Sequence, residues 1–261
     1  MDKYQKQLAA NMARVKRLRE NPLGFYVSAA LAGFYIGLGF LLSQYAKSAL
    51  AGHPMGALVA ALLFPVGLVM VIFAGSDLFT GIVLSISLDR FQKQNSRLAG
   101  LKLGLAAWLG NFIGSFILAV LLYFSRTGGT ALDETILNSV SAKASLTIPE
   151  MIFRGILCNI FVCLAIWIAY ALQSEGAKIA ICYALISAFV FLGFEHVVAN
   201  MFIFSYAVLK SGAQVALIGQ TIPLISLLKS LLFVTIGNII GGALFVATPY
   251  HLIMRREIKD F

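Results

Sequence analysis

An acid, an imidazole and an amide lie together inside an otherwise apolar stretch of this chain. Glu195, His196 and Asn200 fall within residues 193–201, with sixteen uncharged residues before the acid and thirteen after the imidazole. Because a segment of this length crosses a bilayer, the ionisable pair is expected near its middle. Ionisable groups at that depth need a partner, a cavity or water, so we interpret the three residues as a central functional site. A purely structural pair within a helix bundle is the alternative.

The composition indicates an integral membrane protein. Hydrophobic residues make up 60% of the 261 residues and charged residues 12%, whereas about 25% of a soluble domain is charged. The net charge of +9 gathers at the ends of apolar segments, where anionic lipid explains it and nucleic acid is not implied. Cys158, Cys163 and Cys182 lie in apolar segments without the spacing of metal ligands, so no metal or other cofactor is expected.

A second apolar region is too long for one straight transmembrane helix. Residues 48–88 contain Asp77 as their only charge and would extend about 60 Å as one helix, twice the hydrocarbon core of about 30 Å. Gly75 and Gly81 flank this acid and predict a non-helical bend around it. Irregular backbone at membrane depth is tolerated where protein or a water-filled cavity satisfies it, so the bend indicates a transport pathway.

The two halves of the chain echo one another. Gly75 precedes Gly193 by 118 residues, and Asn111 precedes Asn238 by 127 residues. Each half contains three predicted spans, and an odd number of spans inverts the second copy relative to the first. We therefore expect an all-α membrane protein with six transmembrane helices in a 3+3 inverted repeat, in which helices 2 and 5 are broken.

The domain boundaries follow from this pattern and from the distribution of charge. Fourteen Lys and Arg residues lie on the side of the two termini and four lie in the opposite loops, so the positive-inside rule places both termini in the cytoplasm of a multi-pass inner-membrane protein. The basic N-terminal helix faces anionic lipid or serves only as a topology signal. The predicted parts are an amphipathic helix at 1–20, a channel domain at 21–254 with repeats at about 21–124 and 149–251, a polar loop at 125–148, and a cytoplasmic tail at 255–261.

These motifs together resemble the formate/nitrite transporter family. The matching residues cover nearly the whole chain, and the string at 194–201 is the most specific of them. The resemblance implies a channel with an aquaporin-like inverted repeat that forms a homopentamer in the lipid membrane, with one pore in each protomer. It implies small monovalent anions as substrates, with nitrite favoured by the fourth span and with formate or hydrosulfide as alternatives. The matching strings lie at 21–25, 75–81, 109–111, 157–167 and 194–201.

The resemblance also assigns roles to single residues. The central histidine of the family corresponds to His196, its loop threonine to Thr80 and its fourth-span amide to Asn159. Lys143 resembles the lysine that draws anions into the outer vestibule. Without the family match, ordinary packing is the expected role of each apolar residue. The implied apolar pore residues are Leu68 and Phe64 in the cytoplasmic constriction, with Leu78, Phe79 and Phe189 as further constriction residues.

A small anion sheds water in an apolar constriction, and an unpaired charge there is unfavourable. The Thr80 hydroxyl, the Asn159 amide and the potential near Lys143 are expected to replace that hydration. His196 serves either as a hydrogen-bond donor or as a proton source, since an unperturbed imidazole has a pKa of about 6.5. Its charge stays open, because burial favours the neutral ring and a nearby carboxylate favours the charged ring. Glu195 is adjacent in sequence, and because adjacent helical residues do not face each other, we interpret it as a structural or an orienting residue.

Two other classes of protein are less consistent with the sequence. A neutral-solute channel of the aquaporin type normally carries paired Asn-Pro-Ala boxes at its breaks, and neither break supplies one. A membrane enzyme would require a metal-ligand cluster, a nucleophile motif or a phosphate loop. We find none of these motifs in the sequence, so we expect a channel that is not an enzyme.

Overall fold

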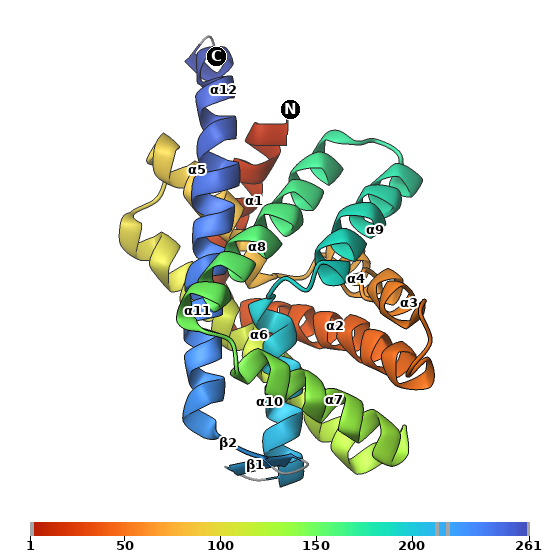
Figure 1. Cartoon of the computed structure of the whole chain (residues 1–261). Coiled ribbons are helices and arrows are strands. Elements are labelled where there is room, and N and C mark those ends of the chain that lie inside the picture. Colours follow the sequence, from red (N-terminus) through yellow and green to blue (C-terminus); the bar gives the residue numbers. More distant parts are fainter. Residues whose placement is uncertain (1–2, 212–213, 218–219, 260–261) are drawn as a thin grey trace.

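The computed structural model describes residues 3–211, 214–217 and 220–259, and it consists of helices with one short hairpin (Figure 1). Residues 1–2 of the predicted N-terminal helix and residues 260–261 of the predicted tail lie outside this description. The elements are α1 (Lys3–Glu20), α2 (Pro22–Ala49), α3 (Gly56–Leu63), α4 (Val66–Ala74), α5 (Phe79–Gln92), α6 (Arg97–Ser125), α7 (Gly129–Ala144), α8 (Ile148–Ala171), α9 (Glu175–Phe191), α10 (Val197–Ser211), β1 (Gln214–Leu217), β2 (Gln220–Pro223), α11 (Leu224–Gly242), the π-helical turn η1 (Ala243–Ala247) and α12 (Thr248–Lys259).

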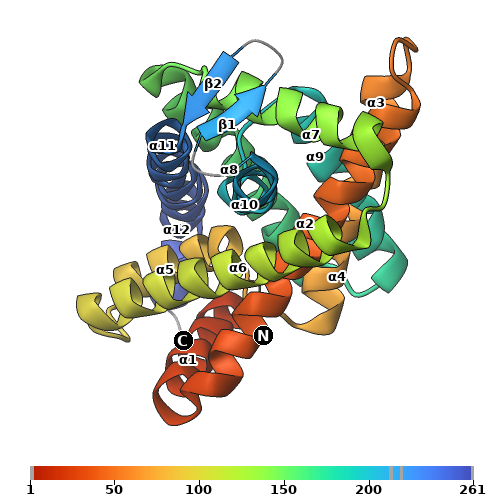
Figure 2. The ribbon, with the colours of Figure 1, turned by 90° about the horizontal axis from the view of Figure 1, so that it is seen from below.

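The predicted all-helical, apolar architecture is confirmed. Within the described ranges, five helical segments are long and apolar enough to cross a membrane, and α10 is a shorter apolar helix. Figure 2 shows α10 end-on at the centre of the molecule, where it contacts α2, α6, α7 and α11. Every residue from Val197 to Ala207 on this helix is buried. The five segments are Pro22–Ala49, Gly56–Ala74, Arg97–Ser125, Ile148–Ala171 and Leu224–Met254.

The region predicted as a polar loop is largely helical. Helix α7 occupies Gly129–Ala144, and Gly128 precedes it with a φ of 87° in the left-handed region that favours glycine. Leu132, Ile136 and Val140 are buried along one side of the helix. A spacing of four residues places them on one side of a helix. The loop prediction was wrong because the polar residues of the opposite side dominated the composition.

The first helix break is closed by a buried asparagine. Helix α4 ends at Ala74 and is capped by Gly75, which has a φ of 73°, and α5 begins at Phe79. The Asn111 side chain from α6 accepts a hydrogen bond from the Phe79 N–H at 2.8 Å. Its amide nitrogen donates to the carbonyl oxygens of Ala29 at 2.7 Å and Asp77 at 2.9 Å. One side chain therefore satisfies three backbone groups in a region where water is scarce.

The second break is closed in the same way. Helix α9 ends near Gly193, which has a φ of 72°, and α10 begins at Val197. The Asn238 side chain from α11 accepts a hydrogen bond from the Val197 N–H at 3.0 Å. Its amide nitrogen donates to the carbonyl oxygens of Gly155 at 2.8 Å and Glu195 at 2.9 Å. The asparagines that echo one another in the sequence thus make equivalent hydrogen bonds at equivalent breaks.

Helix α1 is attached to the first break through a buried carboxylate. Asp77 is 1% exposed, and its side chain pairs with Arg14 Nε at 2.9 Å and with the Arg17 guanidinium. The Ser28 hydroxyl donates to the same carboxylate at 2.8 Å. Helices α1 and α12 lie at one end of the molecule, and α7 and the hairpin lie at the other end (Figure 1). The predicted surface helix is therefore docked on the bundle.

We expect Asn238→Ala to lower the free energy of unfolding by about 3 kcal/mol, because it leaves one buried N–H and two buried carbonyls without their amide partner. Titration of the purified protein in mild detergent with SDS measures this change. The control is Asn138→Ala, which removes an exposed amide from α7 and should change stability by less than about 0.5 kcal/mol. Equal stability of the two variants would contradict the role of Asn238 in closing the break.

We expect Asp77→Asn to loosen α1, because it removes the carboxylate that pairs with two guanidinium groups. Hydrogen exchange of the α1 amides should accelerate about tenfold, since breaking a largely buried ion pair is strongly destabilising. Glu20→Gln is the matched control, because Glu20 pairs with Lys16 and Arg19 at the surface and exposed pairs contribute little. Exchange at the wild-type rate in Asp77→Asn would show that other contacts hold the helix.

Candidate functional site

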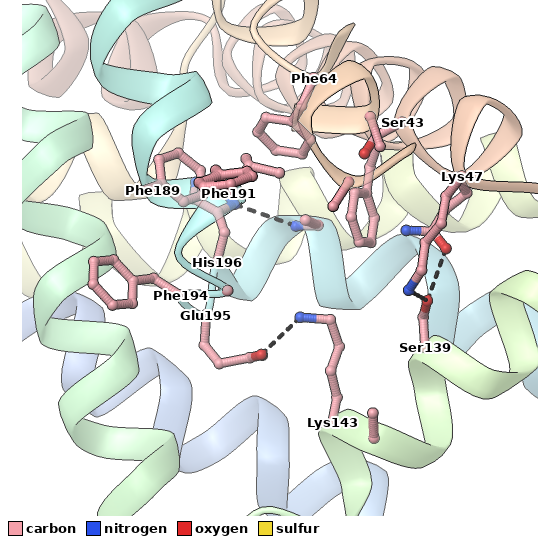
Figure 3. A pocket seen from close by; sticks show the side chains of 18 of the residues that line it. Ser43, Lys47, Phe64, Ser139, Lys143, Phe189, Phe191, Phe194, Glu195 and His196 are labelled. Carbon is pink, nitrogen blue, oxygen red and sulfur yellow. Dashed lines mark hydrogen bonds and ion pairs between the residues drawn. The ribbon is translucent and has the colours of Figure 1, made fainter. Parts of the chain in front are cut away.

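A cavity of about 280 Å³ lies between the second break, α2 and α7 (Figure 3). Its walls combine aromatic rings with cationic and hydroxyl groups, so it is suited to a small polar solute. Figure 3 shows the Lys143 side chain extending toward Glu195, with His196 close to the ring of Phe64. The lining residues include Phe40, Ser43, Gln44, Lys47, Phe64, Ser139, Lys143, Arg154, Phe189, Glu195 and His196.

The imidazole of His196 is held by hydrogen bonds at both nitrogens. Nδ1 accepts a hydrogen bond from the Ala199 N–H at 3.3 Å, and Nε2 lies 3.1 Å from Thr80 Oγ1. Because a backbone N–H only donates, Nδ1 carries a lone pair here, and the proton of the neutral ring lies on Nε2, where it donates to Thr80. His196 therefore caps the first turn of α10 and joins the two breaks through the Thr80 hydroxyl.

Apolar side chains and His196 enclose a void that has no room for a water molecule. Phe64, Phe189 and His196 line both this void and the cavity of about 280 Å³ described above, which we call the Lys143 cavity. Leu78 lines both the void and a second cavity beneath α1. The Phe189 ring stacks near the His196 ring, with centroids 6.1 Å apart. The void thus lies between two polar cavities. Its walls are Ile36, Phe64, Leu68, Leu78, Val162, Ile186, Phe189 and His196.

The cavity beneath α1 has a volume of about 580 Å³ and is lined by several cationic side chains. Lys6, Lys178 and the two arginines that pair with Asp77 line it. The Lys6 ammonium donates to the Tyr170 carbonyl at 3.0 Å. Both ends of the dry void therefore open toward positive charge.

Among the predicted site residues, Phe64, Leu68, Leu78, Phe189 and His196 line the void, and Phe79, Thr80, Asn159, Asn200, Glu195 and Lys143 do not. Phe79 is buried and lines an apolar groove with Trp108 and Leu231 between α5, α6 and α11. Asn159 is also buried, and its amide nitrogen donates to the carbonyl oxygens of Thr80 at 3.3 Å and Asn238 at 2.6 Å. The Asn159 side chain therefore positions the backbone at Thr80.

The positive charge of Lys143 is matched by a carboxylate. Lys143 Nζ lies 2.8 Å from Glu195 Oε1, and Asn200 donates to Glu195 Oε2 at 2.8 Å. The two Glu195 carboxylate oxygens therefore connect α7 to α10. Because the charges of Lys143 and Glu195 nearly cancel, Lys143 alone supplies little net attraction for an anion.

Sequence reasoning missed the polar side chains that α2 contributes to the cavity. Ser43, Gln44 and Lys47 line it together with Ser139 of α7. Ser43 and Lys47 are four residues apart, so they lie on one face of a helix. That spacing was the available signal, and the apolar residues around it concealed it.

Comparison with known proteins gives a consistent assignment. The family model for formate/nitrite transporters matches residues 4–252. The nitrite transporter NirC of Escherichia coli strain K12 is 40% identical over 251 residues, which cover 93% of this chain and 88% of that protein. The formate channel FocA of Haemophilus influenzae is 32% identical over 254 residues, with coverage of 91% and 89%.

Solved structures agree with these relatives. A structure described as an FNT family ion channel has a TM-score of 0.88 and 30% identity, covering 96% of this chain and 98% of that chain. A pentameric formate channel with formate bound has a TM-score of 0.76 and 26% identity, with coverage of 88% and 96%. These relatives are transporters and channels, so the enzyme alternative is excluded at the level of the family. The chain belongs to the formate/nitrite transporter family.

Proposed function

We propose that this protein conducts small monovalent anions across the inner membrane, with nitrite as the first substrate and formate and hydrosulfide as alternatives. The observation that carries the proposal is a dry void between two cavities lined by cationic side chains, with His196 in its wall and the Thr80 hydroxyl 3.1 Å behind the His196 ring, at Nε2. Nitrite is placed first because the relatives named as nitrite transporters reach 40% identity and the formate channels 32%.

We further propose the six-span arrangement, with both termini in the cytoplasm. The first repeat consists of α2, the broken segment α3–α5, and α6, and the second consists of α8, the broken segment α9–α10, and α11 continuing into α12. Equivalent closure of the two breaks by Asn111 and Asn238 supports the inverted repeat at about 21–124 and 149–251. The basic helix at 1–20 and the tail at 255–261 then flank the channel domain at 21–254.

A homopentamer with one pore in each protomer is part of the same proposal. It is supported by the likeness to a structure described as a pentameric formate channel. The five protomers would be embedded in lipid, and each would contain its own two cavities and void.

Passage through the void requires a replacement for the water that the anion loses. The Thr80 hydroxyl accepts a hydrogen bond from His196 Nε2–H in the neutral ring, which leaves its own hydrogen free to donate to an anion. Nitrite and formate both accept such a bond. This mode needs no net transfer of a proton.

Proton coupling is a second mode of the same pair. A proton arriving on Nδ1 breaks the hydrogen bond from Ala199. Nε2 then passes its proton to Thr80 Oγ1, while the Thr80 hydroxyl passes its own hydrogen to the anion. The ring ends neutral with its proton on Nδ1, and the anion becomes a neutral acid that crosses apolar surface more easily.

We expect His196→Asn to preserve assembly and to change the pH dependence and anion selectivity of flux into proteoliposomes. An asparagine can still cap α10, because its side-chain oxygen accepts a backbone hydrogen bond, but it does not titrate. His196→Phe removes the cap as well. The measurement compares nitrite, formate and hydrosulfide between pH 5 and pH 8. An unchanged flux and pH profile in both variants would remove the relay.

We expect Thr80→Val to reduce nitrite flux about tenfold, because it deletes the hydroxyl that pairs with His196 and that we propose as the donor to the anion, while it nearly preserves the side-chain volume. Thr80→Ser keeps the hydroxyl and is the matched control, with flux within about twofold of the wild type. Stopped-flow flux at saturating nitrite makes the comparison. A valine variant as active as the serine variant would show that the hydroxyl does not contact the anion.

A further inference from the structure

Lys47 is the uncompensated cation of the Lys143 cavity. Three cations line this cavity, namely Lys47, Lys143 and Arg154, together with one carboxylate, Glu195. Glu195 pairs with Lys143 at 2.8 Å, and Arg154 lies 3.7 Å from Glu150. In the part of the chain that the structure describes, Lys47 makes no ion pair. The cavity therefore keeps positive charge at the end of α2.

The groups around Lys47 form a fixed polar wall. The buried Ser139 hydroxyl donates to Gln44 Oε1 at 2.8 Å, and Lys47 Nζ lies 3.5 Å from the same hydroxyl oxygen (Figure 3). Because the Ser139 hydroxyl donates to Gln44 Oε1, the oxygen of the Gln44 amide is occupied and the nitrogen remains as a donor. Its amide nitrogen has no acceptor among the described residues, so it is free to donate to a solute in the cavity.

This polar wall lies where an anion could bind before it enters the void. The same cavity is lined by Phe64, Phe189 and His196, which also form one end of the dry void. A volume of about 280 Å³ holds a three-atom anion with several waters, since a water occupies about 30 Å³. An anion at Lys47 would therefore be partly hydrated and would lie next to the entrance of the void.

We infer that Lys47, Gln44 and Ser139 form a binding subsite for a small monovalent oxyanion at the mouth of the conduction path. The Lys47 ammonium supplies the charge, the Gln44 amide supplies a directed donor, and Ser139 orients both. Lys143 contributes mainly by neutralising Glu195, which would otherwise repel the anion. The subsite rests on the proposed anion transport for its role, and its existence is testable without transport.

The binding test measures acetylation of single lysines by acetic anhydride in the purified protein, followed by mass spectrometry of peptides. Sodium nitrite or sodium formate should slow acetylation of Lys47 at least about threefold, since a bound anion holds the ammonium and covers it. The reference within the same chain is Lys102, an exposed lysine on α6. Ionic strength is kept constant with the sodium salt of a bulky sulfonate buffer.

Selective protection of Lys47 supports the subsite, and equal protection of Lys47 and Lys102 overturns it. This result holds whether or not the protein conducts anions. Absence of nitrite, formate and hydrosulfide flux in wild-type proteoliposomes would overturn the proposed function and leave a protected Lys47 standing as a binding site. The two failures are therefore distinguishable.

The transport test compares Lys47→Gln, Lys47→Arg and Arg126→Gln. At low salt and low nitrite concentration, Lys47→Gln should reduce initial flux about tenfold, because a local cation raises the anion concentration at the mouth. Lys47→Arg should restore flux to within about threefold of the wild type, since it keeps the charge. Arg126→Gln removes an exposed cation from the turn before α7 and should leave flux unchanged. An equal loss in Lys47→Gln and Arg126→Gln would assign the effect to general surface charge and overturn the subsite.

Discussion

A helix that is interrupted at membrane depth must find partners for the backbone groups that the interruption frees, and the whole structure depends on how this is done. Asn111 and Asn238 each accept one N–H and donate to two carbonyls, using side chains from neighbouring helices. These contacts fix where α5 and α10 begin. Thr80 consequently lies in the first turn of α5 and His196 at the cap of α10, with Thr80 Oγ1 3.1 Å from His196 Nε2.

Each break also carries a carboxylate, and each carboxylate is neutralised by a helix from outside the breaks. Asp77 pairs with the arginines of α1, and Glu195 pairs with Lys143 of α7. A lone carboxylate beside the path would repel an anion and would be unfavourable to bury. The two surface helices therefore do more than cover the bundle, because they neutralise the carboxylates of the two cavities. The remaining cations, such as Lys47, then determine the sign of the potential in the cavities.

The sequence predicted the features that depend on local chemistry. Gly75 and Gly193 both have a positive φ, which glycine favours, and they lie between α4 and α5 and between α9 and α10. The direction of single side chains was harder to predict. Phe79 and Thr80 are neighbours, yet Phe79 faces a groove between helices and Thr80 faces His196. Which of them faces His196 depends on how α5 is rotated, and Asn111 and Asn159 from distant parts of the chain hold the α5 backbone.

The cap at His196 constrains how the pair can act. Both ring nitrogens already make hydrogen bonds, one with the Ala199 N–H and one with Thr80. Added protons must therefore displace a backbone bond at the start of α10, where the helix dipole also disfavours positive charge. Donation by the Thr80 hydroxyl needs only rotation of one O–H. The geometry thus provides hydrogen bonding without rearrangement, whereas proton transfer is coupled to the first turn of the helix that stands at the centre of the molecule.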